Sequence, residues 1–346
     1  MIKDAIAKLI ERQSLTEAEA ESVMLEIMDG QAVPSQIASY LTALRMKGET
    51  VEEITGSARA MRTKATRIRP NDPVVVDTCG TGGDGAGTFN VSTTVALVLA
   101  GAGITVAKHG NRAISSRAGS ADILKALGVR IDLAPERVEE CVNDIGIGFL
   151  FAPMFHTAMK YAAPVRQEIG LRTMFNVLGP LTNPAGASIQ ILGVYDGALT
   201  NTLAQVLMNL GTRHCYVVHG LDGLDEITLT NRTRVSEGKA GRITSYFIEP
   251  RDFGFERARL KDLSGGDAGE NARITRDILE GRDGPRQQLI LLNAAPGFVA
   301  CGKATTLQEG VERARAVIRS GAAMEKLESL IKWTNRHGER SEASTD

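Results

Sequence analysis

A glycine-rich segment constrains this chain more than any other feature. From Asp77 to Thr93 the sequence reads Asp-Thr-Cys-Gly-Thr-Gly-Gly-Asp-Gly-Ala-Gly-Thr-Phe-Asn-Val-Ser-Thr, between an apolar run at 74–76 and a helical pattern over 93–102. Glycines have no Cβ atom to keep a ligand away from the backbone. The N–H groups of such a loop, and those of a helix that starts near Ser92, can converge on phosphate oxygens. The segment therefore predicts a strand, an anion-binding loop and a helix.

Three interpretations of this loop compete. Gly80, Gly82 and Gly85 match the dinucleotide fingerprint, but no acidic residue lies between Asp84 and Asp122, where the ribose ligand is expected. A Walker A loop needs a lysine, and 80–93 has none. A tight turn without a ligand is the third interpretation. Polar side chains in the loop argue against it, and these are Asp84, Thr88, Asn90, Ser92 and Thr93.

A second polar segment follows a short apolar run at 105–107. Lys108 leaves the C-terminal end of that predicted strand, where open parallel α/β sheets place their ligands. Residues 108–116 offer an ammonium, a guanidinium, an amide and two hydroxyls, and Ser120 adds a hydroxyl at the start of a predicted helix over 121–127. A charge run is usually a solvated face. This run is short, contains a glycine and follows a buried strand, so it favours an anion site.

Composition bounds the class of protein. The 346 residues are 43% hydrophobic, enough for a substantial core and for two lobes. Forty basic and 41 acidic side chains give a net charge of −1, so we expect neither nucleic acid nor a membrane as a partner. The four cysteines are far apart and lack metal-ligand spacing, which is typical of reduced thiols in the cytoplasm. We expect no signal peptide, because charges interrupt residues 1–8, and no spanning helix.

The pattern of elements changes near residue 70. Capping boxes at Thr16 and Thr50, with Gly30 and Gly48 at expected helix ends, predict four helices and no strand in 1–70. Beyond this, apolar runs alternate with helical patterns up to residue 337, and the predicted strands are 74–76, 105–107, 148–151, 189–194 and 215–218. This alternation predicts an α/β domain with a largely parallel sheet covered by helices. We expect the polar tail, 338–346, to be disordered.

Seven motifs together resemble one family over nearly the whole chain. They are Gly80-Thr-Gly-Gly-Asp84, Asn90-Val-Ser-Thr93, Lys108-His-Gly-Asn-Arg112, Gly119-Ser-Ala-Asp122, Ala163-Pro-Val-Arg166, Asn176-Val-Leu-Gly-Pro-Leu-Thr-Asn-Pro184 and His219-Gly-Leu-Asp-Gly-Leu-Asp-Glu226. In this order and spacing they resemble the anthranilate phosphoribosyltransferases. The glycine loop and the lysine segment alone also have relatives among pyrimidine-nucleoside phosphorylases, so the full series carries the resemblance.

The resemblance implies the fold and the activity. It implies a small helical domain of residues 1–70 joined by a returning segment at about 155–181, a larger α/β domain of residues 71–337 of the nucleoside phosphorylase/phosphoribosyltransferase type, and an active site between them. It further implies a homodimer that forms through the helical domain. The implied reaction transfers the phosphoribosyl group of 5-phosphoribosyl 1-pyrophosphate (PRPP) to the amine of anthranilate in tryptophan biosynthesis.

The resemblance also implies a role for individual residues. For the donor it assigns Gly80, Gly83, Asp84, Thr88, Asn90, Val91, Ser92, Thr93, Lys108, His109, Gly110, Asn111, Arg112, Ala113, Ile114, Ser115, Ser116 and Ser120. For anthranilate it assigns Gly80, Asn111 and Arg166, the guanidinium of which would bind the carboxylate. It assigns no general base, since the neutral aromatic amine needs no prior deprotonation.

An isolated Asp-Glu pair is more often an exposed acidic pair, but the resemblance implies a magnesium site at Asp225 and Glu226. Carboxylate oxygens suit Mg²⁺, which takes further ligands from substrate phosphates. Neighbouring side chains on an extended strand point to opposite faces, so joint ligation requires a turn, or else two separate metals. The resemblance adds the Ser92 hydroxyl as a ligand and implies two ions per active site, one of which arrives with the donor.

The sequence departs from the family next to the acceptor pocket. Many relatives have a paired histidine after Phe-Ala-Pro, whereas this chain has Phe155 before His156. We expect His109 and His156 to border the aromatic substrate. Two other functions stay open: a nucleoside phosphorylase, which would use free phosphate as nucleophile, and a non-catalytic paralogue that binds nucleic acid.

Overall fold

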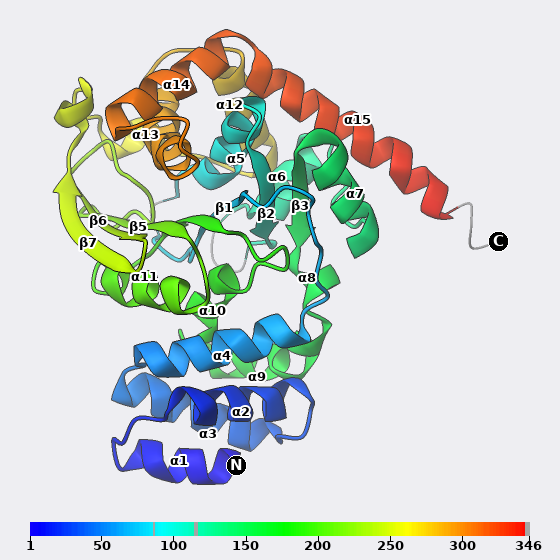
Figure 1. The fold of residues 1–346 in the computed structure, drawn as a ribbon, viewed down its shortest axis with the longest axis vertical. Helices are drawn as coiled ribbons and strands as arrows, with labels where there is room; N and C mark the ends of the chain where they lie inside the picture. Colours follow the sequence, from blue (N-terminus) through cyan, green and yellow to red (C-terminus); the bar gives the residue numbers. More distant parts are fainter. Residues whose placement is uncertain (86, 114–116, 343–346) are drawn as a thin grey trace.

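Helices form the first part of the chain, which is seen at the bottom of Figure 1. The structure, a computed structural model, describes residues 1–85, 87–113 and 117–342. The N-terminal helices are α1 (Ile2–Ile10), α2 (Glu17–Met28), α3 (Pro34–Lys47) and α4 (Val51–Lys64). Capping boxes at Thr16 and Thr50 begin α2 and α4, and Gly30 and Gly48 take positive φ just beyond α2 and α3. The predicted helix signals are therefore confirmed.

A close helix crossing and a buried ion pair stabilise the packing of α2, α4 and their neighbouring loops. A Cβ atom on Gly56 of α4 would lie 2.2 Å from the Glu17 carbonyl oxygen of α2, so this crossing needs a glycine. The fully buried Glu53 pairs with Lys47 at 3.0 Å and also accepts the Leu15 N–H at 2.9 Å. One carboxylate thus satisfies a buried cation and a buried backbone donor.

The described part of the chain holds a seven-stranded sheet in the order β3-β2-β1-β4-β5-β6-β7. The strands are β1 (Val75–Gly80), β2 (Thr105–Gly110), β3 (Ile147–Phe151), β4 (Ile189–Gly193), β5 (His214–Gly220), β6 (Thr233–Lys239) and β7 (Arg242–Ile248). The first five strands in this order are parallel, as predicted, and β6 and β7 are antiparallel. The sequence prediction missed β6 and β7, which form a hairpin at the edge.

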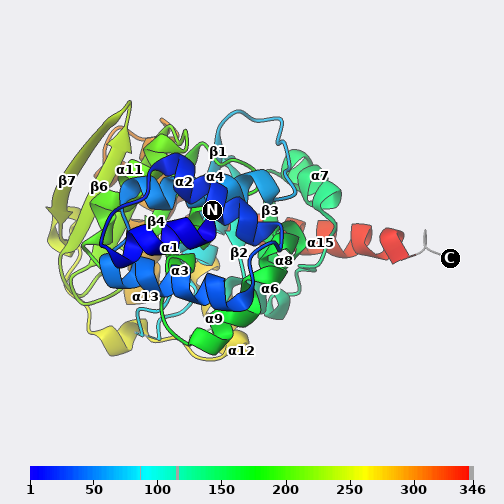
Figure 2. The same ribbon diagram turned by 90° about the horizontal axis from the view of Figure 1, so that it is seen from below.

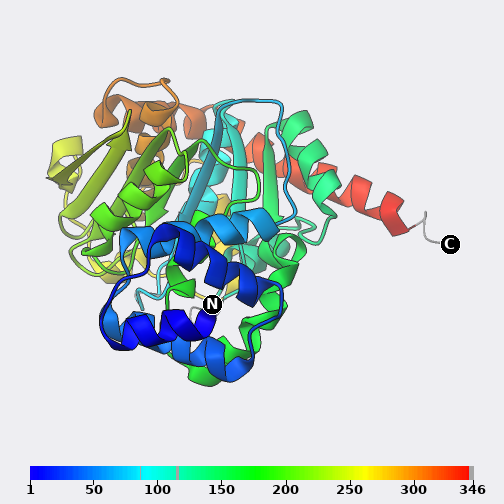
Figure 3. The same cartoon turned by 60° about the horizontal axis from the view of Figure 1, so that its bottom comes forward.

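Helices cover both faces of this sheet, which Figure 3 shows behind the N-terminal helices. The helices that follow β1, β2 and β3 are α5 (Val91–Gly101), α6 (Ser120–Ala126), α7 (Pro135–Ile145) and α8 (Ala152–Phe155). The C-terminal ones are α12 (Ala268–Leu279), α13 (Pro285–Ala300), α14 (Leu307–Arg319) and α15 (Ala322–Glu342). The apolar helix α5 packs on α13 and α15 at the centre of one core. The predicted helical domain plus α/β domain is confirmed as the fold class.

A segment after β3 leaves the sheet and packs on the N-terminal helices (Figure 2). It contains a 3₁₀ turn, η1 (Thr157–Tyr161), and helices α9 (Ala163–Ile169) and α10 (Phe175–Leu181), and β4 and then α11 (Leu199–Asn209) follow. Helix α9 contacts α3, and α10 and α11 contact α4. Val165 and Leu178 are buried in the same core as α1–α4. This second core continues onto one face of β4 and β5, so the helices and the sheet are packed together.

The end of the chain differs from the expected disorder. Helix α15 continues through residues 338–342, so the prediction of a disordered tail from Gly338 is wrong as far as Glu342. Arg and Glu are good helix formers, and one glycine costs a helix only about 1 kcal/mol. Residues 343–346 lie outside the described residues. Among the described residues, no helix combines the length and the apolar character needed to cross a bilayer.

Candidate active site

The strand order reverses beside β1, and this point marks the candidate site. Strands β2 and β3 extend the sheet on one side of β1, and β4 begins the other side. Ligands of open α/β sheets bind at such a switch point, outside the carboxyl ends of the strands. Here these ends are Gly80 and Gly193, which face each other in the ladder. A Cβ atom on Gly80 would lie 2.5 Å from the Asp225 carboxylate, and one on Gly193 would lie 1.5 Å from the Asp225 backbone. Asp225 therefore crosses directly over the ends of both strands.

The glycine loop runs from Gly80 to α5. Its glycines at 82, 83, 85 and 87 all have φ between 64° and 77°, a region that L side chains rarely adopt. This explains the glycine spacing without the dinucleotide or Walker interpretations. The Gly82 N–H donates to the Asp225 carboxylate at 2.8 Å. Loop and acidic segment are thus in direct contact, although 143 residues separate them in the chain.

Lys108 links the ends of β1 and β2 to the start of α5. Its ammonium is buried and donates to the Thr78 carbonyl oxygen at 2.5 Å and to the Ser92 hydroxyl at 3.2 Å. Burial lowers the pKa of Lys108, and the charges of Asp77, Cys79 and Glu226 raise it again. The structure therefore places the predicted cation beside the predicted hydroxyl ligand Ser92, at the floor of the site.

Three carboxylates converge above this floor. Burial, followed by the charge of Asp84, raises the pKa of Asp225 to about 7. Burial and the charges of Asp225 and Asp84 also raise the pKa of Glu226 well above its usual range, while Lys108 and a hydrogen bond from the Ser92 backbone oppose this shift. Both residues lie in a bend beyond β5, so the turn required for adjacent side chains to act together is present. With all three carboxyl groups ionised, the cluster carries more negative charge than Lys108 compensates.

This charge imbalance fits a divalent cation. Among the described residues no three His, Cys, Asp or Glu side chains form a ready metal cage. Mg²⁺ binds through one or two carboxylates and completes its shell with water and substrate phosphates. The acidic loop is itself held by the buried Asn293 of α13, which pairs with the Ile227 N–H and carbonyl at 2.8 Å each.

The segment after β2 folds over the same end of the sheet. The Asn111 carbonyl oxygen accepts the Ala121 N–H at 3.2 Å, and the Ala113 N–H donates to Asp122 at 3.1 Å. Gly110 touches Ser120, whose hydroxyl would lie 2.1 Å from a Cβ atom at Gly110. The guanidinium of Arg112 lies 5.9 Å from the ring centroid of Phe151. The predicted donor residues Ile114, Ser115 and Ser116 lie outside the described residues.

Other predicted donor residues lie in and around the start of α5. Asn90 precedes the helix and accepts a hydrogen bond from Asn271 at 3.0 Å. Thr88 forms an isolated antiparallel β-bridge with Ser264. Val91 and Thr93 are each 1% exposed, so their side chains face the core and not the loop. At these two positions only the backbone could contact a ligand.

Two buried histidines, His109 at the end of β2 and His156 just after α8, lie close together. The His109 and His156 rings lie 5.1 Å apart and are tilted by 53°. Burial lowers the pKa of His109 well below its usual range and that of His156 to about 4. Both Nε2 atoms are buried without a hydrogen-bond partner in the described part of the chain. The pair is therefore neutral near pH 7.

Arg166 lies on the returning helix α9. Its guanidinium is half-buried, lies 5.1 Å from the ring centroid of Phe175, and forms no ion pair with any described residue. Burial lowers its pKa. No hydrogen bond or ion pair among the described residues joins Arg166 to Gly80 or Asn111, and the assignment of these three residues to anthranilate stays a prediction.

Comparison with known proteins decides the family. The family models "Glycosyl transferase family, helical bundle domain" and "Glycosyl transferase family, a/b domain" match residues 3–65 and 72–324. The chain is 55% identical to anthranilate phosphoribosyltransferase of Moorella thermoacetica, over 96% of this chain and 98% of the relative. The chain belongs to the anthranilate phosphoribosyltransferase family. The resemblance inferred from the seven motifs is confirmed.

Solved structures of anthranilate phosphoribosyltransferases agree over the whole fold. The Thermus thermophilus enzyme superposes with a TM-score of 0.91 at 46% identity, covering 96% of this chain and 99% of that one. The Saccharomyces cerevisiae enzyme in complex with PRPP and Mg superposes with a TM-score of 0.88 at 30% identity, covering 97% of this chain and 98% of that one. The yeast enzyme has also been solved in complex with 4-fluoroanthranilate.

The departure at Phe155 from the anthranilate phosphoribosyltransferase pattern lies in the core. Phe155 has no exposed surface and belongs to the apolar cluster of the α/β domain. Its carbonyl oxygen accepts the Thr66 N–H at 2.9 Å, a contact that any residue type can make. The apolar ring therefore affects packing within the core and exposes no group at the surface.

Sequence reasoning missed two residues beside the glycine loop of this family member. Arg172, between α9 and α10, donates to the Gly83 carbonyl oxygen and lies 4.4 Å from the ring centroid of Tyr195. The Tyr195 N–H in turn donates to the Thr81 hydroxyl at 3.1 Å. Arg172 and Tyr195 thus brace the loop from the side of the helical domain. The signal was the run Gly-Leu-Arg-Thr-Met-Phe-Asn, which leads directly into the predicted motif at 176–184.

Proposed function

We propose that this chain transfers the 5-phosphoribosyl group of PRPP to the amine of anthranilate. The products are N-(5-phosphoribosyl)anthranilate and pyrophosphate, and the reaction is a step of tryptophan biosynthesis. The observation that carries the proposal is the meeting, at one switch point, of a glycine loop, a buried lysine and a cluster of three carboxylates. Family membership, with the yeast relative solved with PRPP and Mg, supports the same donor.

The glycine loop and the start of α5 bind the diphosphate in this proposal. The loop backbone would approach the phosphate oxygens closely, because Gly82, Gly83, Gly85 and Gly87 have positive φ and no Cβ atom. Asn90, Asn111 and Ser120 supply hydrogen bonds to the sugar phosphate. Lys108 contributes a fixed positive charge from below, already oriented by Thr78 and Ser92.

The carboxylates of Asp225 and Glu226, with the Ser92 hydroxyl, would hold Mg²⁺. Burial and mutual repulsion raise the pKa of both carboxylates, and a divalent ion would offset both effects. When bound, the ion neutralises charge on the leaving pyrophosphate. We propose two ions per site, with Asp84 near the ion that arrives with the donor.

The chemical step needs no general base. The amine nitrogen forms a bond to C1 of the ribose while the C1–O bond breaks and its electron pair leaves with pyrophosphate, and the nitrogen then releases its proton to solvent. The chain contributes orientation and charge stabilisation, and well-oriented attack can supply about 7–11 kcal/mol. Neutral His109 and His156 suit an apolar wall for the aromatic ring. Arg166 would bind the carboxylate of anthranilate, and Asn111 with the Gly80 backbone would complete the acceptor pocket.

Both alternatives are less well supported. A nucleoside phosphorylase would not require the Asp225–Glu226 pair, and every relative described above is an anthranilate phosphoribosyltransferase. A nucleic-acid-binding paralogue should combine a basic groove with a degraded metal pair, but both carboxylates are present and the net charge is −1. We further propose the domain division at residue 70 with the returning segment 155–181, a homodimer formed through the helical domain, and a cytoplasmic location.

A steady-state assay of anthranilate fluorescence tests the proposal. Fluorescence should fall only when PRPP and Mg²⁺ are both present, and Asp225→Asn with Glu226→Gln should abolish the Mg²⁺-dependent rate while the far-ultraviolet spectrum is unchanged. Undiminished turnover in that variant would remove the metal assignment. Phosphorolysis of a pyrimidine nucleoside, without consumption of anthranilate, would favour the phosphorylase.

A further inference from the structure

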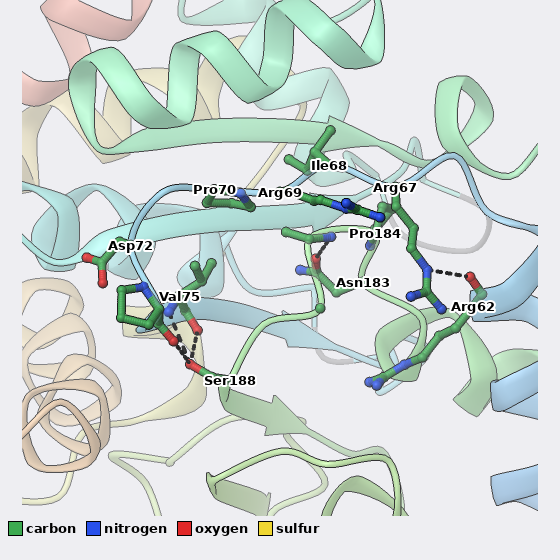
Figure 4. Close-up of a pocket in the computed structure, with 13 residues that line it drawn as sticks. Arg62, Arg67, Ile68, Arg69, Pro70, Asp72, Val75, Asn183, Pro184 and Ser188 are labelled. Carbon is green, nitrogen blue, oxygen red and sulfur yellow. Dashed lines mark hydrogen bonds between the residues drawn. The ribbon is translucent and has the colours of Figure 1, made fainter.

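A pocket lies at the opposite end of the sheet from the candidate active site. Its volume is about 340 Å³, within the range of small-ligand sites. Val75 begins β1 and Ser188 precedes β4, so the pocket opens at the amino ends of the two strands whose carboxyl ends hold the glycine loop. Figure 4 shows residues 68–70 along one side, Asn183 and Pro184 opposite them, and Arg62 and Arg67 at one end.

The pocket is built from two passages of the chain between the helical and α/β domains. One is the linker from α4 to β1, and the other is the loop from α10 to β4. They are tied together by the Ile68 N–H, which donates to the Pro184 carbonyl at 3.3 Å, and by Ser188, which accepts the Val75 N–H at 3.1 Å. A ligand here would contact both passages at once.

Three guanidiniums line this pocket without a carboxylate partner. Arg62, Arg67 and Arg69 form no ion pair with any described residue. The single acidic residue of the lining, Asp72, is occupied: its two oxygens accept the Val74 N–H at 2.8 Å and the Thr105 hydroxyl at 2.7 Å. Glu139 accepts the backbone N–H of Arg69. The lining therefore has a net positive charge.

Arg62 has a structural role that fixes this charge in place. Its guanidinium donates to the carbonyls of Leu181 and Leu210, at the ends of α10 and α11, at 2.7 and 3.0 Å. Burial, followed by repulsion from Arg67 and Arg59, lowers the pKa of Arg62 to about 10. The Arg67 Nε donates to the Arg62 carbonyl at 3.3 Å, and its terminal nitrogens have no partner in the described part of the chain. The positive charges of Arg62 and Arg67 are thus held close together, and a bound anion would reduce the repulsion between them.

We propose that this pocket binds a small oxyanion with two or more negative charges, through Arg67 and Arg69. Guanidiniums bind planar oxyanion groups in a bidentate manner, so a phosphate group and a polycarboxylate are the two chemical sources. Because both arginines are exposed to solvent, binding should weaken as ionic strength rises. The site is independent of the proposed transferase activity.

Calorimetric titration with inorganic phosphate and with citrate tests the site. Phosphate can also bind the glycine loop. None of the substitutions changes that loop, so its contribution to the titration is the same in wild type and in every variant. Arg67→Gln/Arg69→Gln should weaken one binding event at least tenfold, and Arg67→Lys/Arg69→Lys should retain part of the affinity. The tighter of the two probes identifies the chemical source.

A charge-matched control separates a built pocket from general attraction. Arg273→Gln/Arg282→Gln removes two exposed arginines that pair with Asp277 and are not part of the pocket lining. It should leave both titrations unchanged, and neither pair of substitutions should alter kcat at low phosphate. Equal titrations for wild type and Arg67→Gln/Arg69→Gln, or an equal loss in the control, would overturn the proposal.

Discussion

Without metal, the carboxylate cluster should lower the free energy of unfolding of the protein. The substitution Asp225→Asn should raise this free energy again. At pH 8 wild-type Asp225 is ionised although burial and Asp84 raise its pKa to about 7. An asparagine has the same shape and can still accept the Gly82 N–H, but it has no charge to bury. We expect the variant to unfold with a free energy on the order of 1–3 kcal/mol higher than wild type at pH 8 without Mg²⁺.

The pH dependence fixes the sign of this effect. A carboxyl with a folded pKa of about 7 takes up a proton between pH 8 and pH 6, whereas its unfolded counterpart, near 3.8, stays ionised. The folded state therefore binds more protons in this window, and stability rises as the pH falls. For this group alone the gain from pH 8 to pH 6 is about 1.4 kcal/mol. The gain should be absent in Asp225→Asn.

Urea unfolding at pH 8 and pH 6, with and without PRPP and Mg²⁺, measures these effects. Ligand at 100 times its Kd should stabilise wild type by about 2.7 kcal/mol and the variant far less. Asp222→Asn in the same loop is the control. Asp222 accepts the Thr228 and Thr230 hydroxyls, so this variant should lose stability at both pH values. An Asp225→Asn protein less stable than wild type at pH 8 without metal would refute the reasoning.

Three further changes have specific expected outcomes. Arg166→Ala should raise the KM for anthranilate by about 1.5–3 kcal/mol in free-energy terms, with little change in the KM for PRPP; equal effects on both substrates in steady-state kinetics would count against an acceptor role. Arg172→Ala should speed amide exchange of residues 81–85 in the ligand-free protein and raise the KM for PRPP, with partial rescue by Arg172→Lys; unchanged exchange would mean that Arg172 does not brace the loop. Glu53→Ala should lower the free energy of unfolding by about 3–5 kcal/mol, because it leaves Lys47 buried without its partner, while kcat of the folded protein is retained; a loss below about 1 kcal/mol would show that the pair is dispensable.

Local sequence determines the parts of the site that are contiguous in the chain. The glycine loop, its strand and its helix follow each other in the chain, so their order could be predicted from the local sequence pattern. The parallel strands were predictable because buried runs alternate with helical patterns. Asp225 and Glu226 could not be placed from the sequence alone, since the contact of Asp225 with Gly82 spans 143 residues. The family resemblance supplied that pairing.

Features at the edge of the sheet and between the domains escaped prediction for physical reasons. Strand β7 is largely exposed and β6 contains charged residues, so neither shows a buried apolar run. Their turn, Ala240-Gly241, has positive φ at both residues and was the available signal. The contact between Arg172 and Gly83 depends on how the returning segment packs, which local patterns do not encode.

Binding of PRPP measured by calorimetry over a range of Mg²⁺ concentrations tests the central claim most directly. The claim is that the glycine loop and the carboxylates of Asp225 and Glu226 bind the donor jointly with the metal. The account predicts that Mg²⁺ tightens PRPP binding to wild type at least tenfold and has little effect on the Asp225→Asn/Glu226→Gln variant. The same Mg²⁺ dependence in both proteins would contradict it.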